Sequence, residues 1–300
     1  MKRTTVIGSM AMDSVETPFG KVKDVLGGSA TYASISASVF APVNIISVVG
    51  TDFPERYMTL FKKRGVDTGG LRVAEGKTFR WSARYDFDLA YAETLRTELN
   101  VFQDFKPVIP DNVSHRDNLL LANIDPELQR YIFNKVKPTG LVACDTMNLW
   151  IQHKRSALLK LLKKVDIFLL NDAEARQLSG EKGLLDAARY ISSCGVKMVV
   201  IKKGEHGALF FSKGLRAMVP AYLLEKIADP TGAGDTFAGG MIGYLSGHKR
   251  INDRVLRKSL VYGSILASFT VEGFSVEGLL KATPRNIDNR YRHFEKLTRF

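Results

Sequence analysis

Short apolar runs alternate with amphipathic segments along most of this 300-residue chain, and the alternation restricts its possible folds more than any other feature. The apolar runs cover residues 4–10, 43–50, 118–124, 140–146, 165–171 and 196–204. Strands of a parallel sheet are buried on both faces, so they form continuous apolar runs and are joined by helices. We therefore predict a three-layer α/β/α fold of the α/β class, with a mostly parallel central sheet.

One interval breaks the alternation. Residues 71–105 carry β-prone residues at alternate positions, such as Phe79 and Trp81. A period of two predicts an antiparallel sheet with one wet face. Residues 14–25 can add a strand to it. We therefore predict one domain spanning residues 1–300, with a small β-sheet lid formed by 14–25 and 71–105.

The composition excludes several classes of protein. Hydrophobic residues make up 45% and charged residues 25% of the chain, as is usual for a soluble globular protein. No apolar run approaches the roughly 18 residues that a membrane span needs, so we expect a cytoplasmic protein without a membrane partner. Cys144 and Cys194 lie in no Cys-x-x-Cys or Cys/His cluster, which predicts buried free thiols and no zinc site.

The formal net charge of +12 raises the question of an anionic partner. The basic residues are scattered over segments with a helical pattern, such as 153–164 and 248–258. They interleave with no aromatic ladder and match no nucleic-acid module. We therefore predict a solvated basic surface, no nucleic-acid partner, and attraction at most for an anionic small molecule.

The string DPTGAGDTFAGG, residues 229–240, places a glycine turn and one carboxylate at the start of a small-residue helix. Backbone N–H groups of Gly232, Ala233 and Gly234 can approach a phosphate closely, and the helix dipole favours an anion there. Asp235 in the first turn can accept a proton from a substrate hydroxyl while the amides hold the transferred phosphoryl. The simpler alternative is a capped helix with a glycine turn for packing.

Other glycine motifs do not fit this string. The chain contains no GxxxxGK[ST] sequence, and the third glycine position of GxGxxG is occupied by Phe237. The string closely resembles the second signature, D-T-x-G-A-G-D, of the PfkB carbohydrate kinases, the ribokinase-like family. The resemblance implies a ribokinase-like fold, with Asp235 as catalytic base and Gly232, Ala233 and Gly234 as the anion hole. It also implies ATP and Mg²⁺ as cofactors, with K⁺ in addition in some relatives.

Further motifs resemble the family's acceptor site. GSMAMD resembles its first strand, which makes Asp13 the candidate substrate-binding aspartate, although Asp13 as a turn cap is the alternative. GGSATYAS resembles its GG turn, so Gly27 and Gly28 would contact substrate hydroxyls. Tyr32 and Asn123 match other substrate-contacting positions.

The nucleotide side is matched by two stretches. NDAE resembles the family's N-x-x-E, where Asn171 and Glu174 would place Mg²⁺ and the nucleotide phosphates. IKKGEHGA resembles the strand and turn of the ATP site and implicates Lys202, Gly204 and Gly207. The alternatives are a solvated lysine at a strand end and an ordinary glutamate in a helix's first turn.

The stretch ASFTVEGFS, residues 267–275, resembles the last nucleotide-side loop of the family and adds Ser268 to the nucleotide-binding candidates. Five positions match those that hold a monovalent cation in some relatives: Asp229, Thr231, Ser268, Val271 and Gly273.

The departures from the family pattern concern the acceptor. Relatives that use ribose have asparagine where this chain has Tyr32, and glutamate next to Asn123 where it has Ile124. The D-P-N-x-R string is DTMN here, without the arginine. Because a polar site without its partners is costly, we predict that the acceptor is not free ribose. Tyr32, Phe79 and Trp81 can form a stacking surface for a base, or simply pack the lid.

These features predict an ATP-dependent kinase that transfers the γ-phosphoryl to a primary hydroxyl of a sugar or nucleoside. A sugar phosphate or keto-acid sugar is the alternative acceptor, which the +12 charge would suit. The alternatives outside catalysis are a nucleotide- or sugar-sensing protein and a basic interaction protein. We expect a monomer or a homodimer formed through the lid.

Overall fold

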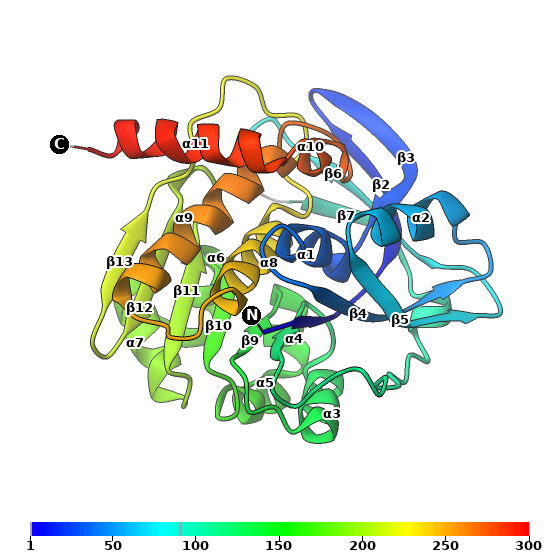
Figure 1. Cartoon of the computed structure of the whole chain (residues 1–300), viewed down its shortest axis with the longest axis horizontal. Helices are drawn as coiled ribbons and strands as arrows, with labels where there is room; N and C mark the ends of the chain where they lie inside the picture. The colour runs from blue at the N-terminus through cyan, green and yellow to red at the C-terminus, as the bar shows by residue number, and fades with distance from the viewer. Residues whose placement is uncertain (1, 90–91, 300) are drawn as a thin grey trace.

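The computed structural model describes residues 2–89 and 92–299, and its centre is a nine-stranded sheet in the order β13-β12-β11-β10-β9-β8-β1-β4-β5 (Figure 1). Neighbouring strands from β5 to β11 in this order run parallel, and β12 and β13 complete the sheet as an antiparallel hairpin. The strands are β1 Thr4–Ile7, β4 Val43–Gly50, β5 Val66–Ala74, β8 Asn118–Leu121, β9 Val142–Asp145, β10 Ile167–Asn171, β11 Met198–Lys202, β12 Ala208–Ser212 and β13 Arg216–Val219.

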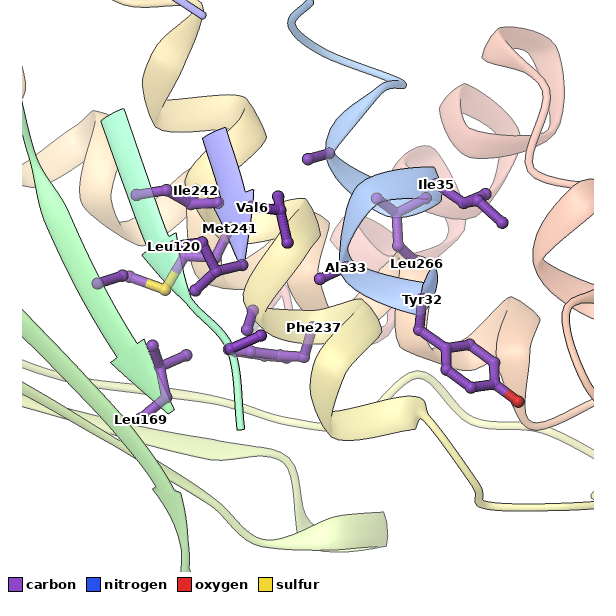
Figure 2. Close-up of a cluster of buried hydrophobic side chains, with 14 of the residues drawn as sticks. Val6, Tyr32, Ala33, Ile35, Leu120, Leu169, Phe237, Met241, Ile242 and Leu266 are labelled. Atoms are coloured by element: carbon purple, nitrogen blue, oxygen red, sulfur yellow. The ribbon is translucent and has the colours of Figure 1, made fainter. Parts of the chain in front are cut away.

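Side chains alternate between the two faces of this sheet. In β10, Ile167 and Leu169 belong to one hydrophobic cluster, and Phe168 and Leu170 belong to the other. Each face therefore needs its own helical layer, which is why central strands such as β4 and β10 are almost entirely apolar. Figure 2 shows part of the first cluster, where strand residues meet α1 and α8. The predicted three-layer fold with a mostly parallel sheet is confirmed.

The helices divide between the two clusters. Those packed on the first are α1 Ser29–Ala37, α2 Glu55–Lys63, α8 Ala233–Ser246, α9 Asp253–Thr270, α10 Glu277–Leu280 and α11 Pro284–Leu297. Those packed on the second are α3 Pro126–Val136, α4 Asn148–His153, α5 Arg155–Leu162, α6 Asp172–Ser179 and α7 Leu184–Ser193. Two short 3-10 turns, η1 Asn100–Phe102 and η2 Gly204–His206, complete the elements.

A second sheet of four strands lies beside the first, in the order β3-β2-β6-β7 (Figure 1, upper right). Its strands are β2 Ala11–Thr17, β3 Gly20–Gly27, β6 Phe79–Tyr85 and β7 Ala92–Glu98. Residues 71–74 of the predicted lid segment belong instead to β5 of the large sheet, and residues 90 and 91 lie outside the described residues.

The pairing of the small sheet differs in part from the antiparallel pattern that we expect. β2–β3 and β6–β7 are antiparallel, but the central pair β2–β6 is parallel. Both central strands follow parallel strands of the large sheet, β1 and β5, after short turns, so they leave the body in the same direction.

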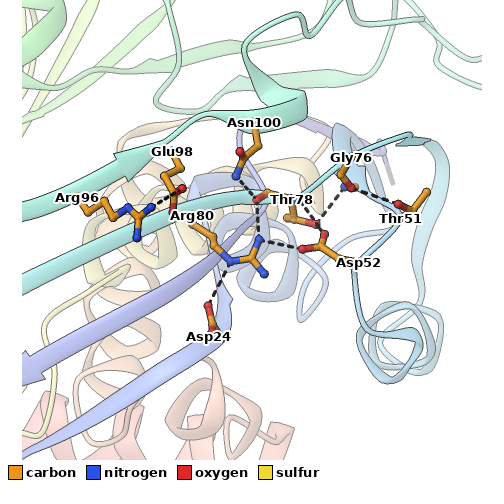
Figure 3. Close-up of polar contacts among 10 residues, drawn as sticks. Asp24, Thr51, Asp52, Gly76, Thr78, Arg80, Arg96, Glu98 and Asn100 are labelled. Carbon is orange, nitrogen blue, oxygen red and sulfur yellow. Dashed lines mark hydrogen bonds and ion pairs between the residues drawn. The ribbon is translucent and has the colours of Figure 1, made fainter.

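A polar cluster joins the base of the small sheet to the body (Figure 3). The Asp52 carboxylate accepts hydrogen bonds from the Thr78 N–H and hydroxyl, both 2.7 Å, and from Arg80 at 2.8 Å. Arg80 also pairs with Asp24 at 3.3 Å, and Asn100 donates to the Thr78 carbonyl at 3.0 Å. The start of β6 and the end of β7 are therefore held together by the same hydrogen-bonded cluster.

Two further expectations can be compared with the structure. Cys144 and Cys194 are both free, but only Cys144 is buried. The prediction of burial is wrong for Cys194, because it follows the last turn of α7 and keeps part of its surface exposed. Within the described ranges, no helix has the length and apolar character of a membrane span.

Candidate active site

Three polar side chains stand at the carboxyl ends of neighbouring strands of the large sheet. Asp145 ends β9, Asn171 ends β10 and Lys202 ends β11, and Asn171 and Lys202 are register partners. The Lys202 ammonium donates to Asp145 Oδ2 at 2.7 Å, with the two side chains 17% and 3% exposed. The alternative of a solvated Lys202 is therefore wrong, because its partner lies two strands away in a buried position.

Glu174 stands next to this pair in the first turn of α6. The helix begins with a capping box, in which Asn171 Oδ1 accepts the Glu174 N–H and Glu174 Oε2 accepts the Asn171 N–H, both at 2.7 Å. Burial raises the pKa of Glu174 to about 7, although nearby Lys202 opposes the rise. Burial opposes the charge of Lys202, but Asp145 and Glu174 raise its pKa. Asn171 and Glu174 are thus brought together as the N-x-x-E pattern implies.

The glycine turn lies between α1 and the end of β11. Gly232 has φ of 76°, the left-handed region, and stands as N-cap of α8. A Cβ atom added there would lie 2.4 Å from the ring of Tyr32, and one added at Gly234 would lie 3.1 Å from Lys202 Nζ. Ala233 N–H already donates to the Pro230 carbonyl at 3.1 Å. The turn therefore brings backbone close to a lysine ammonium, as an anion site requires.

Asp235 follows this turn and keeps part of its surface exposed. Burial raises the pKa of its carboxyl to about 7, and the charge of Asp145 adds to the rise while Lys202 opposes it. A carboxylate with this pKa changes protonation near neutral pH, which suits a general base.

Asp13 lies at the other side of the site, on β2. It is 4% exposed, and the Gly28 N–H donates to its carboxylate. A Cβ atom at Gly27 would lie 1.8 Å from Asp13 Oδ2, so only glycine allows this approach. Burial raises the pKa of Asp13 to about 8, and the charges of Asp229 and Asp235 add to it. The structure thus brings the predicted aspartate and GG turn into direct contact.

The three candidate aromatic residues have different surroundings. Tyr32 is 2% exposed and its ring lies against the Gly232 turn, so the ring is closed to stacking. Phe79 stacks on Phe102, with ring centroids 5.8 Å apart. Trp81 is the register partner of Asp13 in β2–β6, so it projects from the same face of the small sheet as that carboxylate.

Asn123 follows β8 and has partners of its own. Its Oδ1 accepts the Trp150 Nε1–H at 2.9 Å, and its carbonyl accepts the Ser29 hydroxyl at 3.3 Å. Ser29 is the first residue of α1, directly after the GG turn. Asn123 is therefore near the predicted acceptor residues, with its side chain held by Trp150.

The small sheet touches the glycine turn directly. Thr231 Oγ1 donates to the Tyr85 hydroxyl at 3.2 Å, and Asp229 Oδ1 accepts the Thr231 N–H at 2.8 Å. The Val271 carbonyl accepts the N–H groups of Ala228 and Asp229, at 2.7 and 3.3 Å. Burial raises the pKa of Asp229, and bonds to Thr231 oppose the rise.

The remaining nucleotide-side candidates lie in two places. Gly204 begins η2 and Gly207 follows it, with φ of 54° and 80°, shortly after Lys202. A Cβ at Gly207 would lie 2.0 Å from the Val219 carbonyl oxygen, so the turn packs tightly on the end of β13. Ser268 lies on α9, where its hydroxyl accepts a bond from Arg290 at 2.6 Å. No bond joins Ser268 to Lys202 in the part of the chain that the structure describes.

Helices α1 and α8 are in close contact. Cβ atoms at Gly239 and Gly243 would lie 2.2 Å from the Ala33 carbonyl oxygen and 2.7 Å from Ala37. Ser36 Oγ donates to the Thr236 carbonyl at 2.6 Å. The small residues of α8 are therefore needed for backbone contact with the helix that carries the GG turn.

Sequence reasoning missed three residues that contact this site. Asp145 was noted only as part of an incomplete D-P-N-x-R string, and Tyr85 and Trp150 were given no role. For Asp145 a signal existed, because it directly follows a buried strand, as Asn171 and Lys202 do, and ligands bind beyond the carboxyl ends of parallel strands. Tyr85 and Trp150 depend on contacts between distant segments, which no local pattern shows.

Comparison with known proteins identifies the family. Residues 1–281 match the pfkB family carbohydrate kinases. The chain belongs to the PfkB family. It is accordingly a sugar or nucleoside kinase, a phosphotransferase with an alcohol group as acceptor, from a family that uses ATP.

The relatives of this PfkB kinase include nucleoside kinases. A cytidine kinase of Thermococcus kodakarensis is 30% identical over 251 residues, which cover 82% of this chain and 88% of that protein. A nucleoside kinase of Methanocaldococcus jannaschii is 23% identical, covering 98% of both proteins. The solved nucleoside kinase of that organism superposes with a TM-score of 0.76 at 19% identity, over 98% of this chain and 99% of that one. A Thermotoga maritima ribokinase gives 0.77 at 19% identity, over 97% and 100%. The ribokinase-like fold is thereby confirmed.

Proposed function

We propose that this PfkB kinase transfers the γ-phosphoryl of ATP to a primary hydroxyl of a nucleoside. One observation carries the choice of acceptor. Trp81 and Asp13 are register partners in the small sheet, so the indole and the carboxylate that would hold the sugar project from the same face. A base can stack on an indole while its sugar hydroxyls meet a carboxylate. The similarity to a cytidine kinase supports the same class of acceptor.

In this mechanism the two carboxylates have different tasks. Asp13 and the N–H groups of Gly27 and Gly28 orient the sugar hydroxyls. Asp235, when ionised, accepts the proton of the attacking hydroxyl, and the amides around Gly232 and Gly234 stabilise the transferred phosphoryl with Lys202. With a pKa of about 7, Asp235 is increasingly available as a base as the pH rises through 7.

The nucleotide phosphates would contact Asn171, Lys202, Gly204 and Gly207, with Ser268 on the adenosine side. Within residues 2–89 and 92–299, no three His, Cys, Asp or Glu residues are grouped to hold a metal ion. Mg²⁺ bound to ATP needs only one or two protein carboxylates, because phosphate oxygens and waters fill its other positions. Glu174 fits that role, and the ion would neutralise charge on the phosphates.

A monovalent cation is a separate proposal. Asp229 supplies a buried carboxylate for K⁺, and Thr231 and Gly273 supply carbonyl oxygens. The Val271 carbonyl already accepts two N–H bonds, and the Ser268 hydroxyl is bonded to Arg290. A K⁺ site here would therefore rest mainly on the first three residues.

The arginines of the small sheet provide no free cation for a sugar phosphate as acceptor. Arg80 pairs with Asp24 and Asp52, Arg84 with Glu16, and Arg96 with Glu98. An anionic acceptor would need a free cation facing the site. Each of these arginines is already held by a carboxylate.

The first test is ATP consumption by the purified protein with a panel of nucleosides, sugars, sugar phosphates and keto-acid sugars. We expect turnover with a nucleoside, lost by roughly 10² or more in Asp235→Asn while ATP still binds. Turnover only with a sugar or sugar phosphate would overturn the acceptor assignment. ATP binding without turnover on any acceptor would make the protein a sensor.

The second test separates recognition of the nucleobase from catalysis. We expect Trp81→Ala to raise the KM for the nucleoside by roughly 5- to 100-fold, the range that a lost base–aromatic stack produces. The KM for ATP should not change, and Trp81→Phe should retain most of the affinity because it keeps an aromatic face. Equal nucleoside KM values for Trp81→Ala and the wild type would argue against stacking on this residue.

A further inference from the structure

Asp145, the partner of Lys202 in a buried ion pair, has no role in the chemistry described so far. Asp145 is 3% exposed and stands where β9 ends, and its Oδ2 accepts Lys202 Nζ at 2.7 Å. Its other oxygen, Oδ1, accepts the Thr146 N–H at 2.9 Å, which fixes the orientation of the carboxylate. A buried lysine with one fixed partner has its ammonium held at a defined point.

That point lies at the glycine turn. A Cβ atom built on Gly234 would lie 3.1 Å from Lys202 Nζ, so the ammonium is adjacent to the backbone that begins α8. Thr146, the residue after Asp145, has a buried hydroxyl that bonds to no partner within the described residues. A buried ion pair rarely stabilises a fold more than an apolar pair would, so stability alone does not account for this one.

We propose that Asp145 is a positioning residue, whose carboxylate holds the Lys202 ammonium beside Gly234, where it meets the transferred phosphoryl. The proposal rests on the proposed kinase function for the presence of that phosphoryl. Asp145 itself touches no substrate in this scheme and acts through Lys202. The pair would supply a fixed positive charge that needs no reorganisation when the phosphoryl arrives.

The carboxylates around Lys202 explain why a fixed partner is needed. Glu174 and Asp235 also attract this ammonium. Without Asp145, the Lys202 ammonium would be drawn towards the carboxylate of Glu174 or Asp235, and away from the position beside Gly234. The charged and titratable groups that face Asp235 are Asp13, Tyr32, Tyr85, Asp145, Glu174 and Lys202.

A double-mutant cycle tests the proposal. We expect Lys202→Met to lower kcat/KM for ATP by roughly 10² or more and Asp145→Asn by roughly 10-fold or more. If Asp145 acts only through Lys202, the double variant should be no worse than Lys202→Met alone. A double variant whose loss is the product of the two single losses would overturn the proposal.

The pH profile gives a readout that a purely structural role would not move. The charge of Asp145 raises the pKa of Asp235, so Asp145→Asn should shift the acid limb of kcat to lower pH. An acid limb that does not shift would contradict the electrostatic coupling between Asp145 and Asp235. If Asp145→Asn does not fold, Asp145→Glu keeps the charge but displaces the ammonium. Asp145→Glu should then lower kcat without moving the acid limb of the pH profile. A wild-type kcat in Asp145→Glu would overturn the proposal.

A matched control exists on the same sheet. Asp166 pairs with Lys197 at 2.8 Å at the opposite end of the sheet, and Asp166→Asn should leave kcat/KM unchanged. Binding of a non-hydrolysable ATP analogue with Mg²⁺ separates failure of the proposed kinase function from failure of the proposed role of the Asp145–Lys202 pair. No turnover on any acceptor would reject the proposed function, whereas weaker analogue binding by Lys202→Met and Asp145→Asn, but not by Asp166→Asn, would still support the pair's role. Equal binding by all variants would reject it.

Discussion

The two ends of the large sheet each carry an aspartate–lysine pair, with almost the same separation and very different surroundings. At the amino ends of β10 and β11, Lys197 is 75% and Asp166 22% exposed, with N···O of 2.8 Å. At the carboxyl ends of β9 and β11, Lys202 is 17% and Asp145 3% exposed, with N···O of 2.7 Å. Water screens the first pair, which should contribute little, whereas the second is desolvated.

The difference extends to the neighbouring carboxyl groups. At the carboxyl-terminal end, burial raises the pKa values of Asp13, Glu174 and Asp235 to about 8, 7 and 7. Strongly raised carboxyl pKa values gathered in one place are typical of functional sites. The fold therefore gathers carboxyl groups that are costly to ionise at the carboxyl-terminal end of the large sheet, where we propose that the reaction takes place.

The largest expected contrast concerns Asp13. Asp13→Asn should lower kcat/KM for the acceptor by roughly 10² or more, because the sugar loses its orienting carboxylate. The same variant should raise Tm at pH 8, because a buried charge is replaced by a neutral amide of equal size. Steady-state kinetics and thermal denaturation measure both. Wild-type activity, or a lower Tm at pH 8, would contradict this picture of the site.

A smaller effect is expected on the pH dependence of stability. Carboxyl groups whose pKa is higher in the folded state make the folded protein bind more protons than the unfolded one between about pH 4 and pH 8. Their contribution is therefore fully present below about pH 4 and is lost as the pH rises to about 8. Tm should fall from pH 5 to pH 8, and the Tm advantage of Asp13→Asn over the wild type should grow across that window.

Groups with lowered pKa values do not change the predicted fall of Tm between pH 5 and pH 8. Asp52 and Glu127 titrate below their ordinary values, so they are ionised in both states above about pH 5. A Tm that rises steadily from pH 5 to pH 8 would show that the buried carboxyl groups do not govern stability.

The smallest effect is expected at the amino-terminal end. Lys197→Met removes a mostly exposed partner of Asp166 and should cost at most about 1 kcal/mol of unfolding free energy. Catalytic parameters should not change. Chemical denaturation and steady-state kinetics measure the two quantities, and a kinetic effect comparable to that of Lys202→Met would remove the distinction between the two ends.

The sequence predicted the layers of the fold because burial on both faces leaves a continuous apolar run, as in residues 43–50 and 165–171. It did not predict the parallel β2–β6 pair, because pairing between distant strands depends on where each leaves the body. The amphipathic helix α11, Pro284–Leu297, was also missed, since its basic residues were read only as surface charge.

The site was predicted where a motif names a position. Gly27 and Gly28 lie against Asp13, and Asn171 and Glu174 form a capping box, while the contacts with substrate, Mg²⁺ and nucleotide that the family pattern implies stay predictions. The sequence leaves open whether the ring of Tyr32 stacks on a base or packs internally, and the structure buries it against the neighbouring glycine turn. The burial of Lys202 depends on Asp145, two strands away, and no local pattern shows that partner.

The contact between α1 and α8 has a consequence for how this enzyme can evolve. The turn at Gly28, proposed to bind the acceptor, and the turn at Gly232, proposed to bind phosphate, are carried by two helices whose backbones touch at Gly239 and Gly243. A larger side chain at either glycine would displace both turns at once, so this pair of helices offers no independent adjustment of one substrate. New acceptor preferences are therefore most accessible through residues of the small sheet that do not contact the glycine turn, unlike Tyr85, which is bonded to Thr231.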